Sequence, residues 1–496
     1  MAGGRKMKTC RSVIAMAVLA ALPFVAVGAA PDALRDAARK AVVTNPEVQA
    51  QWDTFRAARE DQEVARAGYR PQVDAVASIG REQQHHSGEG LDGTDTFTHR
   101  NLTLSLNQMV YDGFFTRSEV ARFGYAKLTR YYELIEASEG AALEAVRAYG
   151  DVMRYRELTR LAQANYVQHK QIYDQIAERA GAGVGRRVDL EQATGRLALA
   201  ESNLLTEVSN LHDVSARYLR IVGEVPLDAM PGLPVGTAIG QIPPTAKDAL
   251  RTAFNTSPAL NAVVENVRAS QALIDSRRAA FHPRLDLRAR QALDYKLDGF
   301  DGHSREAVVE LVLSYNIFRG GADDARLRQA GDLSNQAKDL REKACRDLRQ
   351  TLAIAYNDVQ RLQEQMRYLD QHQLSIEKAR EAYRRQFDIG QRTLLDLLDT
   401  ENEYFQARRA YVNAGYDQVI AQARALSGMG QLMGALGVVR EDLPTPADLG
   451  QDRSGIDPET MCPPDSPVPM SIDKAALLSE AMKAAGSVPP AGTKGK

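Results

Sequence analysis

Four short segments of the chain alternate between apolar and polar side chains. They form two pairs, residues 73–80 with 101–107, and residues 285–290 with 308–317. Period-two alternation is typical of a β-strand with one apolar and one polar face. About ten residues is also the length at which a tilted strand crosses a bilayer. We therefore expect four transmembrane strands, with a pair of soluble amphipathic hairpins as the alternative.

Four charged residues fall on the polar side of this alternation, namely Asp74, Arg288, Arg290 and Glu310. In a membrane barrel, side chains on the polar face of each strand point into the interior. We expect these four to face a lumen. For Asp74 and Arg290, the alternative is an ordinary position at a strand end beside a loop.

Each pair of strands is followed by a helix of unusual length. Apolar residues recur at three- and four-residue spacing from Thr116 to Ala180 and from Ala322 to Phe387. Neither stretch contains proline, which costs about 3 kcal/mol or more inside a helix. About 65 residues of helix extend close to 100 Å. Gly-containing turns and return helices follow, so we expect two long antiparallel helical hairpins.

This order of elements occurs twice because the chain contains an internal duplication. Tyr69–Asp74 matches Phe281–Asp286 at an offset of 212, and from Tyr111 and Phe318 onwards the offset is 207. The five-residue change falls in a loop rich in Gly, Asp and His. We assign residues 30–240 to the first repeat and residues 241–440 to the second.

The two ends of the chain differ from the repeats. Residues 1–29 combine a basic start with an apolar run and small residues, which predicts a signal peptide. Cys10 precedes that run, so we do not expect a lipidated terminus. Residues 441–496 form a Pro-rich tail that we expect to be irregular, apart from a short amphipathic helix near 474–485.

Composition excludes several classes of protein. Removal of the signal peptide changes the formal net charge from −2 to −6, which argues against a nucleic-acid partner. Cys345 and Cys462 then remain, one in a predicted helix and one in the tail, and we expect no disulfide between them. No metal or cofactor motif and no nucleophile–base pair is evident, so we do not expect this protein to be an enzyme.

The strand count requires more than one copy of the chain. Four strands cannot close a barrel, and open strand edges are not tolerated in lipid. Closed membrane barrels begin at about eight strands. Three copies give twelve strands, so a homotrimer is the simplest closed arrangement.

Several motifs resemble the TolC family of outer-membrane channel-tunnels. The resemblance covers residues 32–440, and its most specific part is the second hairpin turn. The motifs are Asn45-Pro46-Glu47, Tyr69–Asp74, Tyr111-Asp112-Gly113, Phe318–Gly321 and Phe387–Asp399.

The resemblance implies an α+β membrane protein: a trimeric 12-stranded β-barrel in the outer membrane, joined to a periplasmic α-barrel of long helical hairpins. It also implies a periplasmic adaptor protein and an inner-membrane ABC or proton-driven transporter as partners. The duct itself is passive and needs no cofactor.

The candidate gate lies beside the second turn. Asp396 and Asp399 are three residues apart and share a helix face, so a trimer would carry two rings of carboxylates that select cations. The resemblance implies that Arg392 and Asp189 link neighbouring helices when the entrance is closed. Phe387 stands where relatives often have a tyrosine, and it cannot donate that hydrogen bond. Solvated charges at helix ends are the alternative for both aspartates.

The turns themselves are candidate contacts for the adaptor. They contain Gly183, Gly185, Arg186 and Arg187 in the first repeat and Gly390 in the second. For Arg186 and Arg187 the alternative is that they compensate for the hydroxyl missing at Phe387. Cargo is open at this point: the absence of a lipobox-like cysteine favours protein export by type I secretion over lipidated drug-efflux ducts, with small-molecule efflux as the alternative. A soluble periplasmic coiled-coil scaffold is the alternative from another class.

Overall fold

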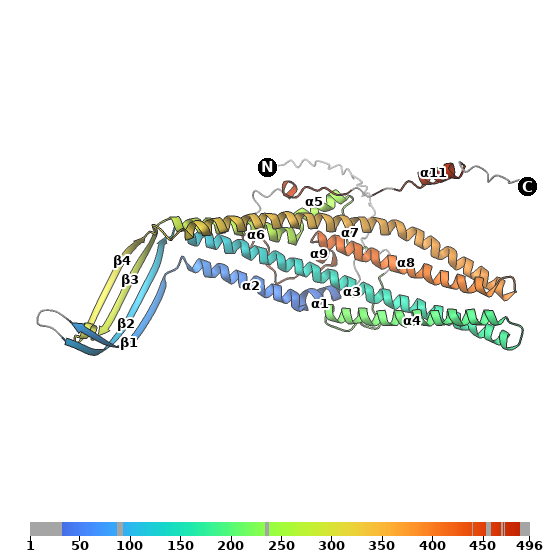
Figure 1. The fold of residues 1–496 in the computed structure, drawn as a ribbon, viewed down its shortest axis with the longest axis horizontal. Coiled ribbons are helices and arrows are strands. Elements are labelled where there is room, and N and C mark those ends of the chain that lie inside the picture. The colour runs from blue at the N-terminus through green and yellow to red at the C-terminus, as the bar shows by residue number, and fades with distance from the viewer. Residues whose placement is uncertain are drawn as a thin grey trace, which may run out of the picture.

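The computed structural model describes residues 32–86, 93–233, 238–438, 440–452, 458–467, 470 and 472–486. The predicted signal peptide lies outside the described residues. The molecule is elongated, with a sheet at one end and helical hairpins whose tips lie at the other (Figure 1). No helix within the described ranges is long and apolar enough to cross a membrane.

The four predicted strands are present as one antiparallel sheet in the order β1-β2-β3-β4. The strands are β1 (Gln72–His86), β2 (Gly93–Tyr111), β3 (Arg284–Tyr295) and β4 (His303–Ser314). The first hairpin is longer than its apolar alternation predicted. Polar residues 81–86 continue the ladder against residues 93–98, because backbone pairing does not require an apolar face.

The register separates an apolar face of the sheet from a polar one. Leu102 lies opposite Ala77 on one side and Leu293 on the other. Ser105, on the other face of the sheet, lies opposite Asp74 and Arg290. Directly opposed residues share a face, so Asp74 and Arg290 lie on one face of the sheet, and Leu102 and Leu293 lie on the other.

Two hairpins of equal design form the body of the molecule. The first joins α3 (Phe115–Gly181) to α4 (Arg187–Val222), and the second joins α7 (Ala322–Asp388) to α8 (Leu394–Gly428). Both α3 and α7 have 67 residues and begin and end 207 residues apart. The predicted bounds differ from these by one residue at most, because no proline or glycine turn interrupts the pattern.

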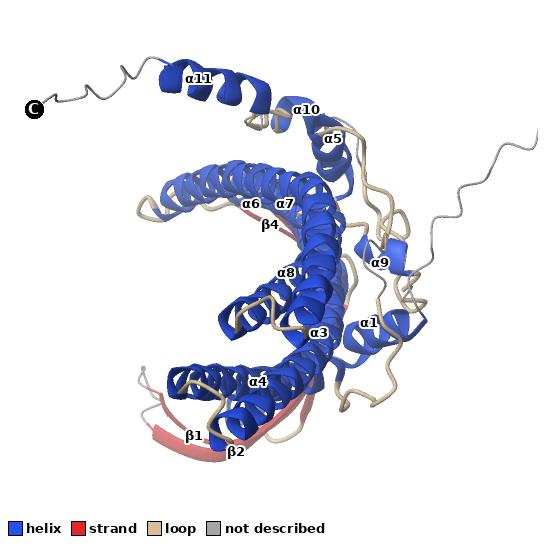
Figure 2. Cartoon of the chain, turned by 90° about the vertical axis from the view of Figure 1, so that its right-hand side faces the viewer, coloured by secondary structure: helices blue, strands red, loops and turns tan. Residues whose placement is uncertain are grey.

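Shorter helices complete the wall. Before the strands of each repeat lie α2 (Pro46–Ala67) and α6 (Pro258–Arg278), each with proline at its start. The Asn45 side chain accepts a hydrogen bond from the backbone N–H of Glu47 and caps α2. Around α3 pack α2, α4, α6 and α8, while α7 packs on α6 and α8. The result is a curved wall with α2 and α4 at one edge and α7 at the other (Figure 2).

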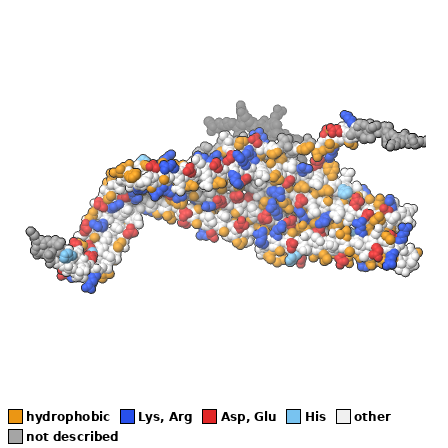
Figure 3. All heavy atoms as spheres, viewed as in Figure 1, with side chains coloured by type: hydrophobic (Ala, Val, Ile, Leu, Met, Phe, Trp, Pro, Cys, Tyr) orange, Lys and Arg blue, Asp and Glu red, His pale blue; other side chains and the backbone are white. Residues whose placement is uncertain are grey.

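Several small elements were not predicted. They are α1 (Asp32–Thr44), α5 (Ala246–Thr256), α9 (Leu432–Leu436), α10 (Pro458–Met461) and the 3₁₀ turns η1 (Ala279–Phe281) and η2 (Leu297–Gly299). The expected helix in the tail is present as α11 (Lys474–Gly486). Figure 3 shows basic and acidic side chains interspersed along the helices on the face drawn.

The largest apolar core lies near the middle of the helical body. It joins α1, α5 and α9 to both hairpins. The Tyr149 hydroxyl donates to the Pro231 carbonyl at 2.6 Å, and its repeat counterpart Tyr356 donates to the Pro244 carbonyl at 2.6 Å. The two equivalent tyrosines therefore both bind the segment that connects α4 to α5.

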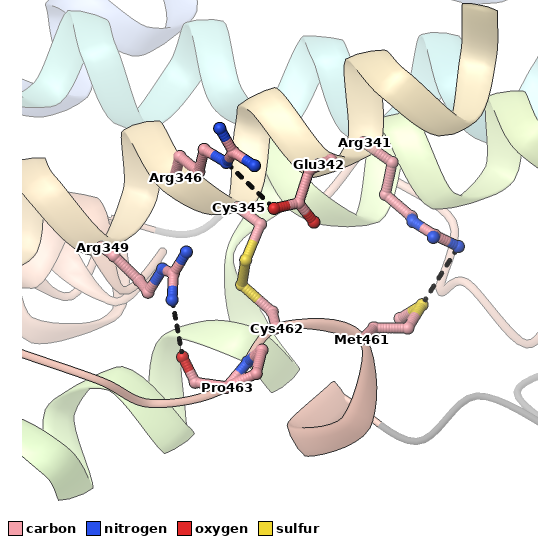
Figure 4. Close-up of a disulfide and its surroundings, with 8 residues drawn as sticks. All are labelled: Arg341, Glu342, Cys345, Arg346, Arg349, Met461, Cys462 and Pro463. Atoms are coloured by element: carbon pink, nitrogen blue, oxygen red, sulfur yellow. Dashed lines mark hydrogen bonds and ion pairs between the residues drawn. A yellow bond between two sulfur atoms is a disulfide. The ribbon is translucent and has the colours of Figure 1, made fainter. Parts of the chain in front are cut away.

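The expectation that Cys345 and Cys462 are unpaired is wrong, since they form a disulfide (Figure 4). The tail returns along the outside of α7 and brings the two Cα atoms to 5.8 Å. Both residues are buried in the central core. A separation of 117 residues hid this contact from local reasoning, because the pairing depends on the path of the tail and not on any motif.

Candidate functional site at the hairpin tips

Both hairpin tips are closed by a glycine with a left-handed backbone. Gly183 has φ +73° and Gly390 has φ +76°, a region that other residues rarely adopt. Next to Gly183, the Gly185 N–H donates to the Arg179 carbonyl at 3.0 Å. At the second tip the Gln391 N–H donates to the Gln386 carbonyl at 2.8 Å. Both are helix-terminating turns that satisfy the last carbonyls of the long helix.

Asp396 caps the start of α8. Its backbone N–H donates to Thr393 Oγ1 at 3.3 Å, and the Thr393 N–H donates back to Asp396 Oδ2 at 3.3 Å. This reciprocal pair is a capping box, which satisfies two free backbone donors at the helix start. The carboxylate predicted as a gate group therefore also fixes the beginning of the helix that carries it.

Arg392 is held on the same tip by three groups. Its Nε donates to Gln386 Oε1 at 2.9 Å, and its Nη1 lies 3.8 Å from Asp396 Oδ2. The guanidinium also lies over the Tyr383 ring, 4.3 Å from its centroid. Within one chain Arg392 thus binds its own hairpin, and the predicted link to a neighbouring helix stays a prediction.

Asp399 connects the two hairpins. Its carboxylate is ion-paired and hydrogen-bonded to Arg196 of α4. The side chains of Asp396 and Asp399 are 38% and 52% exposed, so both carboxylates are accessible to water and ions. Sequence reasoning missed Arg196, because the contact joins residues 203 apart.

Phe387 lies in a small apolar core between the tips. It is buried with Ile172 and Ile176 of α3 and with Leu394, Leu397 and Leu398 of α8. The Arg179 guanidinium lies 5.5 Å from the centroid of its ring, a cation–π arrangement. The residue that cannot make a tyrosine hydrogen bond therefore joins the hairpins by packing.

Charged contacts behind this core join the same helices. Glu401 is buried on α8 and pairs with Arg380 at 2.8 Å, while Glu207 is buried on α4 and pairs with Arg409 at 2.8 Å. Arg384 donates a hydrogen bond to Gln168 of α3. Removing one partner of a buried pair leaves an uncompensated charge. The Arg380–Glu401 pair therefore holds α7 against α8, and the Arg409–Glu207 pair holds the two hairpins together.

The remaining predicted residues lie around the first tip. Asp189 is in the first turn of α4, and no described residue forms an ion pair with it. Arg186 precedes α4 and Arg187 begins it, both exposed. Sequence reasoning missed the apolar side chains that accompany them at the tips, Val184 and Ile389, which are strongly exposed.

The charged residues on the polar face of the sheet form pairs across it. Arg290 pairs with Glu306 at 3.0 Å, and Arg288 lies directly opposite Glu310. Asp74 lies in the same row of the sheet as Arg290, across Ser105. One face therefore carries all four residues predicted to line a lumen, and the lumen itself stays a prediction.

A metal centre is not evident in this region. Among the residues that the structure describes, no three His, Cys, Asp or Glu side chains are grouped so that they could hold an ion. What the arrangement provides instead is a set of exposed carboxylates and arginines on two helical tips. Such groups act on ions and on contacts between helices.

Comparison with known proteins places this geometry in context. The family model described as "Outer membrane efflux protein" matches residues 37–224 and 249–431, one segment in each repeat. The outer membrane efflux protein BepC of Brucella suis is 24% identical over 427 residues, which cover 86% of this chain and 91% of BepC. The alkaline protease secretion protein AprF of Pseudomonas aeruginosa is 25% identical over 407 residues, 79% of this chain and 83% of AprF.

A solved structure has the same fold. A membrane protein from Pseudomonas aeruginosa superimposes with a TM-score of 0.73 at 20% identity, covering 81% of this chain and 94% of that one. The match extends over most of both chains.

Proposed function

Because the chain belongs to the outer membrane efflux protein family, we propose that three copies of it form a passive exit duct across the periplasm and the outer membrane. The family and the outer-membrane location predicted from the sequence are confirmed. Its members are channel proteins of export systems. The trimer, the cargo and the gate described below are our proposals.

The open sheet is the observation that carries the proposal. Its outer strands β1 and β4 each have one edge without a partner in the sheet. Large side chains on the apolar face, among them Ile79, Leu104 and Val309, are strongly exposed. A lipid-facing sheet cannot leave backbone groups unpaired, and β4 of one copy beside β1 of the next removes both edges. Three copies close a twelve-stranded barrel with the polar face inside.

The helices support the same closure. With α7 at one edge of the wall and α4 at the other, each copy offers one edge to the next. Exposed apolar residues lie on both edge helices, including Leu340 and Ile354 on α7 and Val208 on α4. A ring of such contacts is heterologous and closes only when the rotation between copies is right.

The tips form the proposed periplasmic entrance. In a trimer, Asp396 and Asp399 form rings of three carboxylates, which favour cations at a constriction. The Asp399–Arg196 pair and the Phe387 core hold the two hairpins of each copy together. The exposed turns around Gly183, Gly185, Arg186, Arg187 and Gly390 are the proposed contact for a periplasmic adaptor, through which an inner-membrane ABC or proton-driven transporter delivers cargo.

For cargo we propose protein substrates of a type I secretion system. The likeness to AprF, a protease secretion protein, supports this choice. Small-molecule efflux is the second candidate, supported by the likeness to BepC, an efflux protein. Deleting the gene in its natural host discriminates the two: loss of exported proteins from the medium supports secretion, and increased sensitivity to toxic compounds supports efflux.

The assembly is tested by native mass spectrometry of the detergent-extracted protein. We expect a particle of three chains in outer-membrane fractions. A stable, folded monomer would contradict the trimer and would favour the alternative of a soluble periplasmic scaffold.

A further inference from the structure

The tail is fastened to α7 at two separate places. The first is the Cys345–Cys462 disulfide, flanked by a hydrogen bond from Arg349 Nη1 to the Pro463 carbonyl at 3.3 Å (Figure 4). The second lies 23 residues farther along α7, where Lys474 Nζ donates to the Tyr368 hydroxyl at 2.7 Å and lies 3.9 Å from Glu364. The start of α11 is therefore attached to the edge helix of the wall.

An apolar stripe on α11 is left uncovered. Leu477, Leu478 and Met482 are 57%, 63% and 68% exposed. Residues one and two turns apart share a helix face, so Leu478 lies on the same side as Lys474. Lys474 contacts α7, whereas the apolar side chains on this face remain largely exposed in one chain. In one chain, however, the wall ends at α7.

The membrane does not cover this stripe. Tyr368 lies 46 residues beyond the start of α7, about 70 Å from the strands. Figure 2, which looks along the long helices, draws α11 side-on, so α11 runs across them on the outside of the wall. The occupant of this face must therefore be a protein surface in the periplasm.

The repeat identifies what lies at this level on the next copy. Because α3 and α7 are related by an offset of 207, Tyr368 lies level with residue 161 of α3. Since α11 runs across the long helices, it stays near this level. The contact of Thr159 with Glu207 places this level opposite roughly residue 205 of α4. On α4, Leu199 and Leu205 are 47% and 66% exposed at this level.

We propose that α11 crosses the subunit boundary and packs its Leu477–Leu478–Met482 stripe on the α3–α4 hairpin of a neighbouring copy, as a clasp that ties the trimer together at its middle. This inference rests on the proposed trimer. The α7 edge of one copy must meet the α4 edge of the next when the wall closes. The disulfide then anchors the clasp in its own chain while the apolar stripe joins the neighbour.

A photo-crosslinking amino acid at Leu478 tests the clasp in the full-length protein in membranes. Irradiation is expected to give covalent dimers and trimers on denaturing gels. Peptide mapping should join α11 to residues of the α3–α4 hairpin. The same probe at Glu480, on the opposite side of α11, is expected to give at least fivefold less product.

Charge reversal supplies a second variant that does not touch the apolar stripe. Lys474→Glu places two carboxylates together at Glu364 and is expected to lower the cross-link yield from Leu478 at least threefold. Lys483→Glu makes the same change on the opposite face, and the yield should stay as in wild type.

Each outcome decides between the clasp and the trimer. The clasp would be overturned by any of three results: cross-links confined to one chain, cross-links to another protein such as an adaptor, or equal yields from the two probe positions. None of these would contradict a trimer observed by native mass spectrometry. Absence of a trimer before irradiation would overturn both proposals.

Discussion

Glu139 is a buried carboxyl that links α3 to the short helix α9. It accepts hydrogen bonds from the backbone N–H groups of Leu432 at 3.1 Å and Met433 at 3.3 Å. Burial raises the pKa of Glu139 to about 7, and the two backbone hydrogen bonds only partly oppose this. Its ordinary pKa is 4.5, so the folded chain holds this proton more tightly than the unfolded chain does.

The stability of the helical body should therefore fall as the pH rises from about 4.5 to 7, by an amount on the order of 3 kcal/mol from this group. Glu139→Gln keeps an acceptor for the N–H groups and removes the charge. We expect its thermal midpoint by circular dichroism to drop less between pH 5 and pH 8 than that of wild type. Glu144→Gln, at a partly exposed position of α3, serves as control. An unchanged pH dependence in Glu139→Gln would contradict the assignment.

The Arg196–Asp399 pair should matter for opening more than for stability. Both side chains are partly exposed, and such pairs contribute about 0–1 kcal/mol. We expect Arg196→Ala to raise the conductance of the reconstituted channel with a nearly unchanged thermal midpoint. In a double-mutant cycle, its effect should be much smaller once Asp399→Ala is present. Additive effects would show that the two residues act separately.

For single residues, the contacts that can be predicted from the sequence are those between residues close together along the chain. The capping box was readable from Thr393 and Asp396, three residues apart at a helix start, although only the gate role was assigned to Asp396. Tyr383 lies beneath Arg392, nine residues away along a turn whose geometry was not predictable. Arg196 could not be found, because its partner belongs to the other hairpin.

Among the elements, the hairpin tips depend on packing at Phe387. Removing a buried phenylalanine side chain costs about 3–5 kcal/mol, and here the loss falls on the contact of α7 with α3 and α8. We expect Phe387→Ala to loosen the tips and speed tryptic cleavage at the exposed Arg186 and Arg187. Phe387→Leu, which keeps most of the apolar volume, should stay resistant. Equal cleavage of both variants would contradict a role for packing in holding the tips.

The long elements were predictable and the short ones were not. Helices of 67 residues without proline leave a long, uninterrupted three- and four-residue period that predicts them directly. In contrast, α1 and α5 have 13 and 11 residues and are held by the central core, so their stability comes from tertiary packing. The strand ends were missed because residues 81–86 pair through backbone and polar side-chain contacts, such as Glu82 with His99, and carry no apolar alternation. The disulfide depended on the path of the tail.

For the whole molecule, one chain is an incomplete structure. Its sheet has two open edges, its curved wall ends at α7 and α4, and the tail helix carries an uncovered apolar stripe. Closure with further copies resolves all three features together. The same closure brings the carboxylates of each tip towards a common axis, so the proposed entrance exists only in the assembly.

Single-channel conductance in planar bilayers tests this account most directly, with wild type compared with Asp396→Ala/Asp399→Ala. Asp347→Ala, an exposed change on α7 about 40 residues from the tip, is the control. We predict a small, cation-selective conductance for wild type and control, and loss of that selectivity in the double variant, because the carboxylate rings are gone. A double variant indistinguishable from wild type would contradict the entrance. No conductance from well-folded trimers would contradict the duct itself.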